Sequence, residues 1–287
     1  MNKKASSVST TGITRQSVTP GNTCLSFLCA GPETGPPIVL IHGLGWDAAH
    51  LWPVQMTRLA QAGWRVLAPD LRGNGGSAPI RTAVRIPDLA DDVAALLHML
   101  SIRNPVIVGF SMGVMVATDL ALRPDIAPMG LVLACGGVTC KPEGEAAVDE
   151  MLAEAAWLGP EAFACAQARA IFAPHWAASN PEAVADFKIW RAEMDQESLT
   201  HSFRAPYGCD YGPQLPFIAC PAAVIVAEKD SFVNLDDARN LASALAHSQF
   251  ETIPECGHMA PIEAPDRFDD ALQRFLTRVL PLPVTGA

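Results

Sequence analysis

Ser111 lies in a Gly-Phe-Ser-Met-Gly segment (109–113), directly between an apolar run and a helical pattern. The run 106–108 predicts a buried strand, and the pattern 114–122 predicts a helix. The flanking glycines let a tight turn close without a side-chain clash. A serine on such a turn exposes its hydroxyl at the carboxyl end of the sheet, where open α/β folds bind ligands. The segment predicts a nucleophile, although a helix-capping serine would share the same short motif.

A histidine that follows the last predicted strand supplies the base that a serine nucleophile needs. His258 lies after the run 250–253 and before the helical pattern 265–280. It is therefore expected on a loop at the same sheet edge as Ser111. Of the seven histidines, His258 is the best placed.

A carboxylate must then hold the imidazole in the correct tautomer. Asp230 follows the predicted strand 223–227, one strand before His258. Glu228 is the competing acid and lies closer to the strand itself. The chain order Ser111, Asp230, His258 is that of one class of nucleophile-elbow enzymes.

Backbone N–H groups near the elbow can stabilise negative charge on a substrate oxygen. The predicted strand 38–41 ends in His-Gly-Leu-Gly (42–45). The N–H of Leu44 can point at the elbow, and the N–H of Met112 directly follows the nucleophile. These two groups form the expected oxyanion hole. His42 is interpreted as a residue that braces the loop.

The elements that must position these residues alternate between strand and helix along most of the chain. Apolar runs at 38–41, 66–68, 106–108, 131–133, 223–226 and 250–253 suit strands that are covered on both faces. Helical patterns lie between them, with Asp88 as the expected cap of the helix near 89–100. The fold class is therefore α/β, with a mostly parallel central sheet flanked by helices.

One segment interrupts this alternation and divides the chain. Residues 141–216 are helical in pattern, rich in alanine and aromatic residues, and contain no convincing strand. We expect an inserted helical cap there, a core formed by 13–140 and 217–287, and a loose tail at 1–12. Some aromatics of the cap are expected to line a pocket. The pocket candidates across the chain are Trp46, Phe110, Trp157, Trp176, Trp190 and Met259.

Composition excludes several classes of function for the 287 residues. The apolar fraction is 49%, which suffices for a large core and excludes a disordered chain. A formal net charge of −10 disfavours nucleic acid and anionic membranes as partners. No export signal or membrane-spanning run is evident, so we expect a cytoplasmic protein with reduced cysteines. The partner is expected to be a small-molecule substrate, and the sequence does not predict an oligomeric state.

Together these motifs resemble the α/β-hydrolase fold superfamily, of the lidded serine esterase, lactonase and carbon–carbon hydrolase type. The resemblance spans about residues 24–280 and includes Asp-Leu-Arg-Gly-Asn-Gly-Gly-Ser (70–77), which is similar to a structural loop of the superfamily. Asn74 stands where histidine or tyrosine is common, and Val114 replaces a common second glycine. Neither departure touches the three catalytic candidates.

The resemblance implies a two-step reaction through an acyl-enzyme on Ser111, with no cofactor and no metal. Serine at the elbow argues against haloalkane dehalogenases and soluble epoxide hydrolases, which use aspartate there. The cap has few basic residues, so the expected substrate is a small, largely apolar carboxylic ester or lactone. Three alternatives remain: a carbon–carbon bond hydrolase for a β-diketone or ring-cleavage product, a non-catalytic small-ligand receptor, and a cofactor-free perhydrolase or haloperoxidase-like activity.

Overall fold

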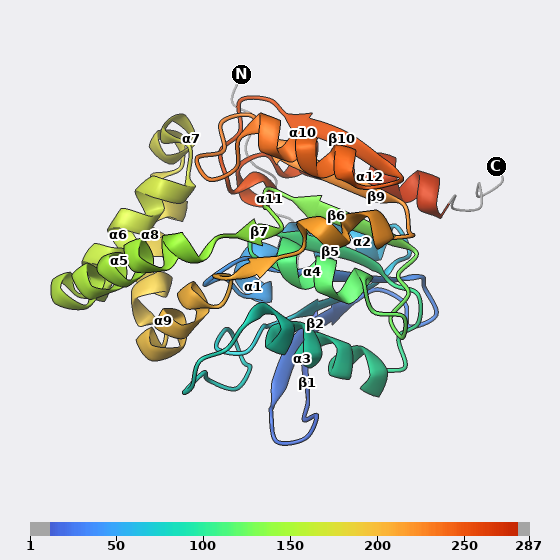
Figure 1. The fold of residues 1–287 in the computed structure, drawn as a ribbon, viewed down its shortest axis with the longest axis horizontal. Helices are drawn as coiled ribbons and strands as arrows, with labels where there is room; N and C mark the ends of the chain where they lie inside the picture. Colours follow the sequence, from blue (N-terminus) through green and yellow to red (C-terminus); the bar gives the residue numbers. More distant parts are fainter. Residues whose placement is uncertain (1–11, 281–287) are drawn as a thin grey trace.

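An eight-stranded sheet forms the centre of the computed structural model, which describes residues 12–280 (Figure 1). The strand order is β1-β2-β4-β3-β5-β6-β9-β10. β2 is antiparallel to β1 and β4, and the other neighbouring pairs are parallel. The predicted α/β class is therefore confirmed. The strands are β1 (Thr14–Val18), β2 (Leu25–Ala30), β3 (Pro37–Ile41), β4 (Arg65–Pro69), β5 (Val106–Phe110), β6 (Gly130–Ala134), β9 (Ala222–Ala227) and β10 (Ser248–Ile253).

Helices cover both faces of this sheet. Successive side chains of each strand point to opposite faces, so the apolar strands present apolar side chains on both faces, and helices bury them. In β3, Val39 and Ile41 join one apolar cluster with α3, α4 and α10, whereas Ile38 and Leu40 join another with α2 and α12. Because both faces of the sheet are covered, the central strands β3, β5 and β6 are apolar along almost their whole length. The helices around the sheet are α1 (Ala48–Leu51), α2 (Pro53–Gln61), α3 (Ile86–Met99), α4 (Gly113–Ala121), α10 (Leu235–Ala244), α11 (Ala260–Glu263) and α12 (Pro265–Val279).

The start of α3 corrects one prediction. Asp88 was expected to cap this helix, but the helix begins at Ile86 and Asp88 occupies its third position. The Asp88 carboxylate there accepts a hydrogen bond from the N–H of Arg85 (2.8 Å). Pro87 explains the earlier start, because a proline in the first turn of a helix needs no hydrogen-bond donor.

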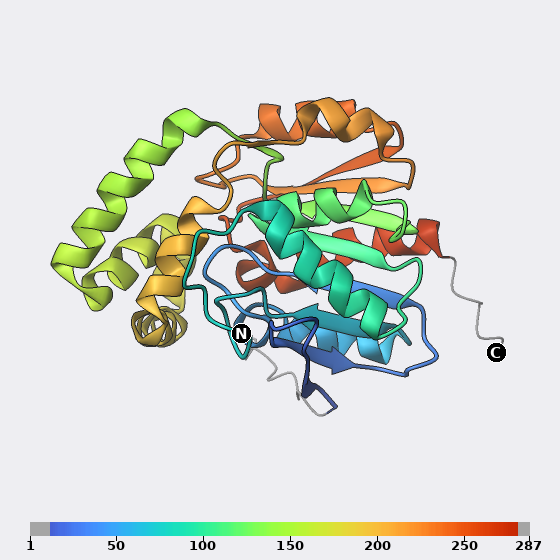
Figure 2. The ribbon, with the colours of Figure 1, turned by 60° about the horizontal axis from the view of Figure 1, so that its bottom comes forward.

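A helical insertion, defined here as α5 to α9, separates β6 from β9 and lies beside the sheet rather than on either face (Figures 1 and 2). The chain leaves through β7 and returns through β8, and these two strands pair antiparallel, with Cys140 opposite Cys209. The elements are β7 (Thr139–Cys140), η1 (Pro142–Gly144), α5 (Glu145–Leu158), α6 (Pro160–Ile171), α7 (Pro174–Ser179), α8 (Pro181–Glu193), α9 (Gln196–Arg204), β8 (Cys209–Asp210) and η2 (Gly212–Phe217).

The structure locates the helices of the expected cap within 141–216. The last turn of that range, η2, lies against α10 of the core. Of the expected tail 1–12, only Gly12 belongs to the described residues. Between residues 12 and 280 no helix combines the length and apolarity needed to cross a bilayer.

Candidate active site

Ser111 lies in the turn between β5 and α4 with a φ of 54°. This left-handed conformation is uncommon for a residue with a side chain and persists only where the surroundings impose it. The Ser111 N–H donates to the carbonyl of Ala134 (2.9 Å), and its own carbonyl accepts from the N–H of Val114 (2.9 Å). A Cβ at Gly113 would lie 2.6 Å from the carbonyl oxygen of Ile41, so the turn closes only with glycine there.

The three candidate catalytic side chains meet at the carboxyl end of the sheet. His258 Nε2 lies 3.0 Å from Ser111 Oγ, and His258 Nδ1 lies 3.0 Å from both carboxylate oxygens of Asp230. The side chain of Asp230 is fully buried and that of His258 nearly so, whereas Ser111 is half-buried. The serine oxygen therefore faces accessible space while the groups behind it are enclosed.

The Asp230 carboxylate is fixed by the loop that carries it. Its Oδ1 accepts hydrogen bonds from the N–H groups of Phe232 (2.8 Å) and Val233 (3.2 Å). Glu228, the competing acid, is exposed and accepts instead from the N–H of Glu255 (2.9 Å). Of the two carboxylates, Asp230 is the one in contact with the imidazole.

Two phenylalanines enclose the imidazole. The Phe110 ring centroid lies 5.3 Å from that of His258, and Phe232 contacts it edge-on at 4.8 Å. Phe232 was missed by the sequence analysis, although it follows Asp230 by two positions in the same loop. Its ring is 59% exposed and lines the cavity above Ser111. Phe110 and Phe232 together hold the orientation of the His258 imidazole and shield part of it from solvent.

Glu263 braces the loop of His258 and was also missed. Its carboxylate accepts hydrogen bonds from the N–H groups of Gly257 (3.0 Å), Met259 (3.2 Å) and Ala173 (3.3 Å). Burial raises the pKa of Glu263, against the opposing effect of these three donors. The side chain thus ties both neighbours of His258 to the start of α7.

The loop after β3 approaches the elbow from the other side. Leu44 and Met112 line the same cavity as Ser111 and His258. Among the residues that the structure describes, neither amide N–H donates to a protein acceptor. Both donors are available to an oxygen bound beside Ser111, as an oxyanion hole requires.

His42 stabilises that loop as a neutral side chain. The Leu71 N–H donates to Nε2 (2.9 Å), so the ring proton is on Nδ1, which donates to the carbonyl of Gly43 (2.8 Å). Burial lowers the pKa of His42. Its interpretation as a loop brace fits these contacts.

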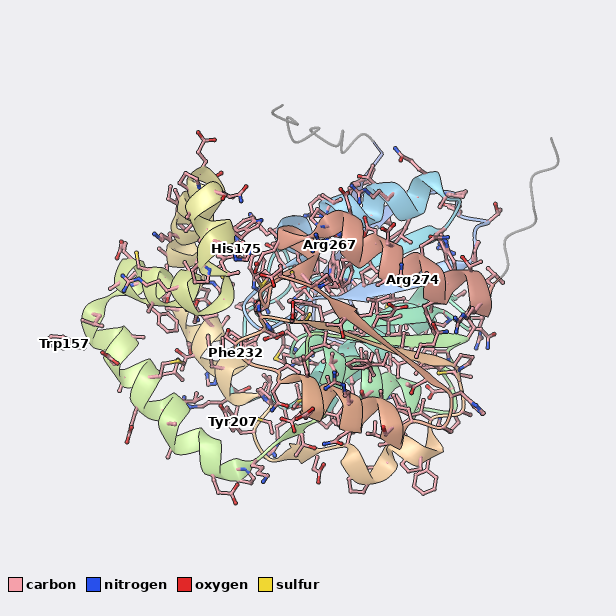
Figure 3. The ribbon with its side chains drawn as sticks, turned by 90° about the horizontal axis from the view of Figure 1, so that it is seen from above. Trp157, His175, Tyr207, Phe232, Arg267 and Arg274 are labelled. Carbon is pink, nitrogen blue, oxygen red and sulfur yellow. The ribbon has the colours of Figure 1, made fainter. Side chains whose placement is uncertain are left out.

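A cavity of about 1010 Å³ opens above Ser111, between the sheet edge and the helical insertion. Its wall is mainly apolar, with contributions from α5, α6, α8, α9 and α10. Two of the predicted pocket residues, Trp46 and Phe110, line it. Figure 3 shows Tyr207 and Phe232, two further lining residues, between the insertion and the core.

The other pocket candidates lie elsewhere. Trp157 is 83% exposed at the outer end of α5, which corrects its predicted place in the pocket (Figure 3). Trp176 stacks on Phe172, and Met259 is buried in the core cluster beneath the loop of His258. Trp190 packs behind Trp46, with ring centroids 5.2 Å apart. Helical periodicity in the sequence shows that a helix has an apolar face. It does not show which neighbouring element that face packs against, so it could not distinguish a residue of the cavity wall from one on the outer surface of the insertion.

Asp70 has the structural role that its motif suggested. Its side chain is buried, accepts hydrogen bonds from the N–H groups of Ala48 and Gly76 (2.9 Å each), and pairs with Arg15. Asn74 is buried in the same loop, away from the triad candidates.

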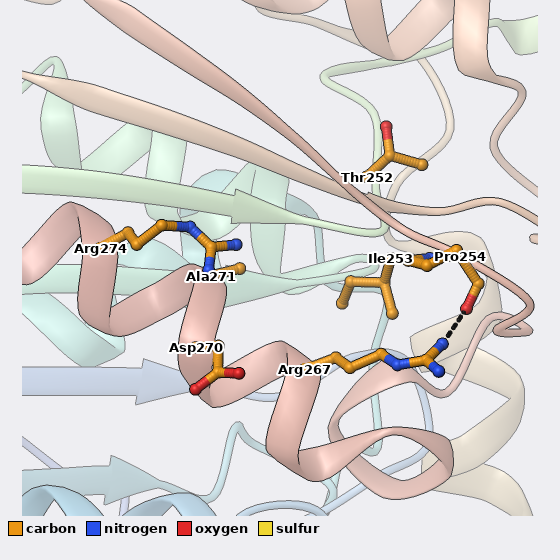
Figure 4. Close-up of a pocket in the computed structure, with 7 residues that line it drawn as sticks. All are labelled: Thr252, Ile253, Pro254, Arg267, Asp270, Ala271 and Arg274. Atoms are coloured by element: carbon orange, nitrogen blue, oxygen red, sulfur yellow. Dashed lines mark hydrogen bonds between the residues drawn. The ribbon is translucent and has the colours of Figure 1, made fainter.

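A second, shallower cavity of about 150 Å³ lies between β10 and α12 (Figure 4). Arg267 donates to the carbonyl of Pro254 there (2.6 Å), and Arg274 pairs with Glu251 (3.0 Å). Both arginines that line this cavity therefore already contact protein oxygens. Within residues 12–280, no three acidic, histidine or cysteine side chains are grouped so that they could hold a metal ion.

Comparisons with known proteins agree with this geometry. Residues 38–271 match the family described as the alpha/beta hydrolase family. The "Putative carbamate hydrolase RutD" of Variovorax paradoxus (strain S110) is 31% identical over 263 residues, which cover 89% of this chain and 97% of that protein.

Two solved structures share the whole architecture. The enol-lactonase from Burkholderia xenovorans LB400 has a TM-score of 0.84 at 27% identity, covering 91% of this chain and 100% of that one. A thermophilic esterase from Thermogutta terrifontis, solved with malate bound, has a TM-score of 0.83 at 27% identity, covering 93% and 99%. Both are named as enzymes that act on ester bonds, cyclic in the first case.

Proposed function

Because the chain belongs to the alpha/beta hydrolase family, we propose that it is a serine hydrolase that cleaves a small carboxylic ester or lactone. The observation that carries the proposal is the continuous hydrogen-bonded chain from Asp230 through His258 to Ser111, which ends at the floor of a mainly apolar cavity. A nucleophile, a base and an orienting acid in this order are what acyl transfer requires.

In the proposed first step, His258 Nε2 takes the Ser111 proton while Oγ attacks the substrate carbonyl. Negative charge moves to the carbonyl oxygen, which the N–H groups of Leu44 and Met112 receive. The imidazolium is stabilised by Asp230 and then protonates the leaving oxygen. An acyl-enzyme remains, and water activated by His258 hydrolyses it in the second step.

The helical insertion acts as the cap of this site in the proposal. It covers the cavity above Ser111, whose volume of about 1010 Å³ is at the upper limit of usual ligand cavities and accommodates a small molecule. The mainly apolar wall favours a substrate with an apolar carbon skeleton.

A carbamate is the second candidate substrate, because the Variovorax paradoxus relative is named for carbamate hydrolysis. Its carbonyl would be attacked by Ser111 in the same way. The leaving group distinguishes the two candidates, and direct comparison of matched esters, lactones and carbamates decides between them.

The test is the intact mass of wild type and Ser111→Ala after treatment with a fluorophosphonate. One adduct on wild type and none on the variant is the expected result, because an activated serine attacks phosphorus as it attacks a carbonyl. Absence of the adduct on wild type, or its presence on Ser111→Ala, would contradict the proposal. A panel of short esters, lactones, carbamates and a β-diketone then identifies the bond cleaved.

A further inference from the structure

Arg191 is the most unusual charged group of the molecule. It lies on α8 of the helical insertion and is only 3% exposed, yet it lines the cavity above Ser111. Within residues 12–280, its Nε and Nη1 atoms are buried without any hydrogen-bond partner. A buried cation normally has a carboxylate or several acceptors beside it, because its desolvation is costly.

In the described part of the chain, the surroundings of Arg191 offer it no ion pair and no hydrogen-bond acceptor for Nε or Nη1. The guanidinium contacts the ring faces of Phe187 (5.1 Å) and Trp190 (5.5 Å), which attract a cation but accept no N–H. Asp47 is the carboxylate whose charge bears on Arg191, but it forms no ion pair with it and its Oδ1 is engaged by the N–H and ring of His50 (2.8 Å each). Burial lowers the pKa of Arg191 to about 9, so the group is still charged at neutral pH.

The position of Arg191 places this charge next to the reacting centre. A Cβ at Gly45 would lie 1.9 Å from Arg191 Nη1, so the guanidinium rests directly on the loop of the oxyanion hole. A Cβ at Gly43, two residues earlier in that loop, would lie 2.9 Å from the Cβ of Ser111. Two residues span at most about 7 Å. These contacts place Arg191 Nη1 within about 15 Å of the Ser111 Cβ, and both residues line the same cavity.

We propose that Arg191 binds a carboxylate in the acyl part of the substrate, so that this enzyme selects small esters or lactones that carry one anionic group. The inference rests on the proposed function, since it assigns the substrate class of the same site. A planar carboxylate matches the fork of N–H donors on a guanidinium. A phosphate dianion fits less well, because Lys141 is the one other lysine or arginine that lines the cavity within the described chain.

The test compares monoethyl glutarate with ethyl valerate, and monoethyl succinate with ethyl butyrate, by titration of released acid. Each pair differs in a carboxylate that replaces a methyl group. Wild type should prefer the anionic ester. Arg191→Met should lower kcat/KM for the anionic ester by a factor of about 10 to 100 and leave the neutral ester within a few-fold. Arg191→Lys should restore part of the preference.

Lys188→Met is the matched control, since it removes one charge from the same helix at a position that does not line the cavity. It should leave both esters unchanged. A fluorophosphonate readout needs no turnover: free glutarate should slow labelling of wild type and not of Arg191→Met.

Two failures are distinguishable. If wild type is not labelled and hydrolyses neither ester, the proposed function is wrong. If wild type is labelled but shows no preference for the anionic ester, or if Arg191→Met slows both esters equally, Arg191 is a structural contact between α8 and the loop and the inference is overturned.

Discussion

Asp230 and Glu228 lie two positions apart after β9, yet only Asp230 reaches the imidazole. Asp230→Asn should therefore lower kcat by a factor on the order of 10⁴, because the amide favours the wrong tautomer of His258. Glu228→Gln should change kcat by no more than a few-fold. The measurement is steady-state hydrolysis of the best ester of the panel. A silent Asp230→Asn together with an inactive Glu228→Gln would exchange the two roles.

His42 links stability to pH through its burial. Its lowered pKa means that the folded protein takes up this proton less readily than the unfolded chain, although Asp70 and Asp47 partly oppose the effect. Its stabilising contribution is therefore complete above the unfolded pKa of 6.5 and is lost as the pH falls through the folded value. One such group gives a slope of at most about 1.4 kcal/mol per pH unit.

His42→Gln isolates this contribution, because glutamine retains a donor and an acceptor but does not titrate. We expect wild type to be the more stable protein at pH 7.5 and its advantage to shrink towards pH 5. Urea unfolding at several pH values measures the difference in the free energy of unfolding. Parallel curves for the two proteins across this range would refute the linkage.

At the scale of elements, the loop between β10 and α11 carries His258, the proposed base, and Glu263 of α11 accepts hydrogen bonds from this loop. In wild type, three backbone N–H groups donate to the Glu263 carboxylate. Glu263→Gln replaces one of its two oxygens with an NH₂ group, which cannot accept, so at least one N–H loses its acceptor. We expect a loss of about 1–3 kcal/mol in the free energy of unfolding and a fall in kcat larger than the change in KM. Chemical denaturation and ester kinetics measure both.

Glu255→Gln is the control for this loop, because Glu255 is exposed and contacts Lys229 at 3.5 Å. It should match wild type in both assays. A Glu263→Gln protein of unchanged kcat would show that the loop of His258 holds its position without the brace.

The elements of the core could be predicted because each strand and helix has its own local pattern. The strand 106–110 is apolar throughout, and the apolar residues of α12 recur at helical spacing. The start of α3 was misplaced because an aspartate in the first turn of a helix and an aspartate at its N-cap look alike in a sequence. Both accept a hydrogen bond from a nearby backbone N–H, as Asp88 does here. Short polar motifs fix where a turn occurs better than which residue caps the helix.

At the scale of the whole molecule, the unpredicted site residues are those that act across distant segments. Glu263 contacts Ala173, 90 positions away, and Arg191 rests on Gly45 from another part of the chain. No local spacing records such contacts. Ser111, Asp230 and His258 could be named from sequence because each lies in the loop after a parallel strand of the sheet (β5, β9 or β10), and parallel strands bring their carboxyl ends to one edge.

The paired strands β7 and β8 join the helical insertion to the core at a single place. Since the insertion leaves and returns at one short ladder, everything between Cys140 and Cys209 is one continuous segment of the chain with both ends at the same point of the fold. That stretch includes Arg191, several walls of the cavity and none of the three triad candidates. Exchanging this segment for another would therefore change several cavity walls, and we expect the sheet and the three candidate residues at its edge to keep their positions.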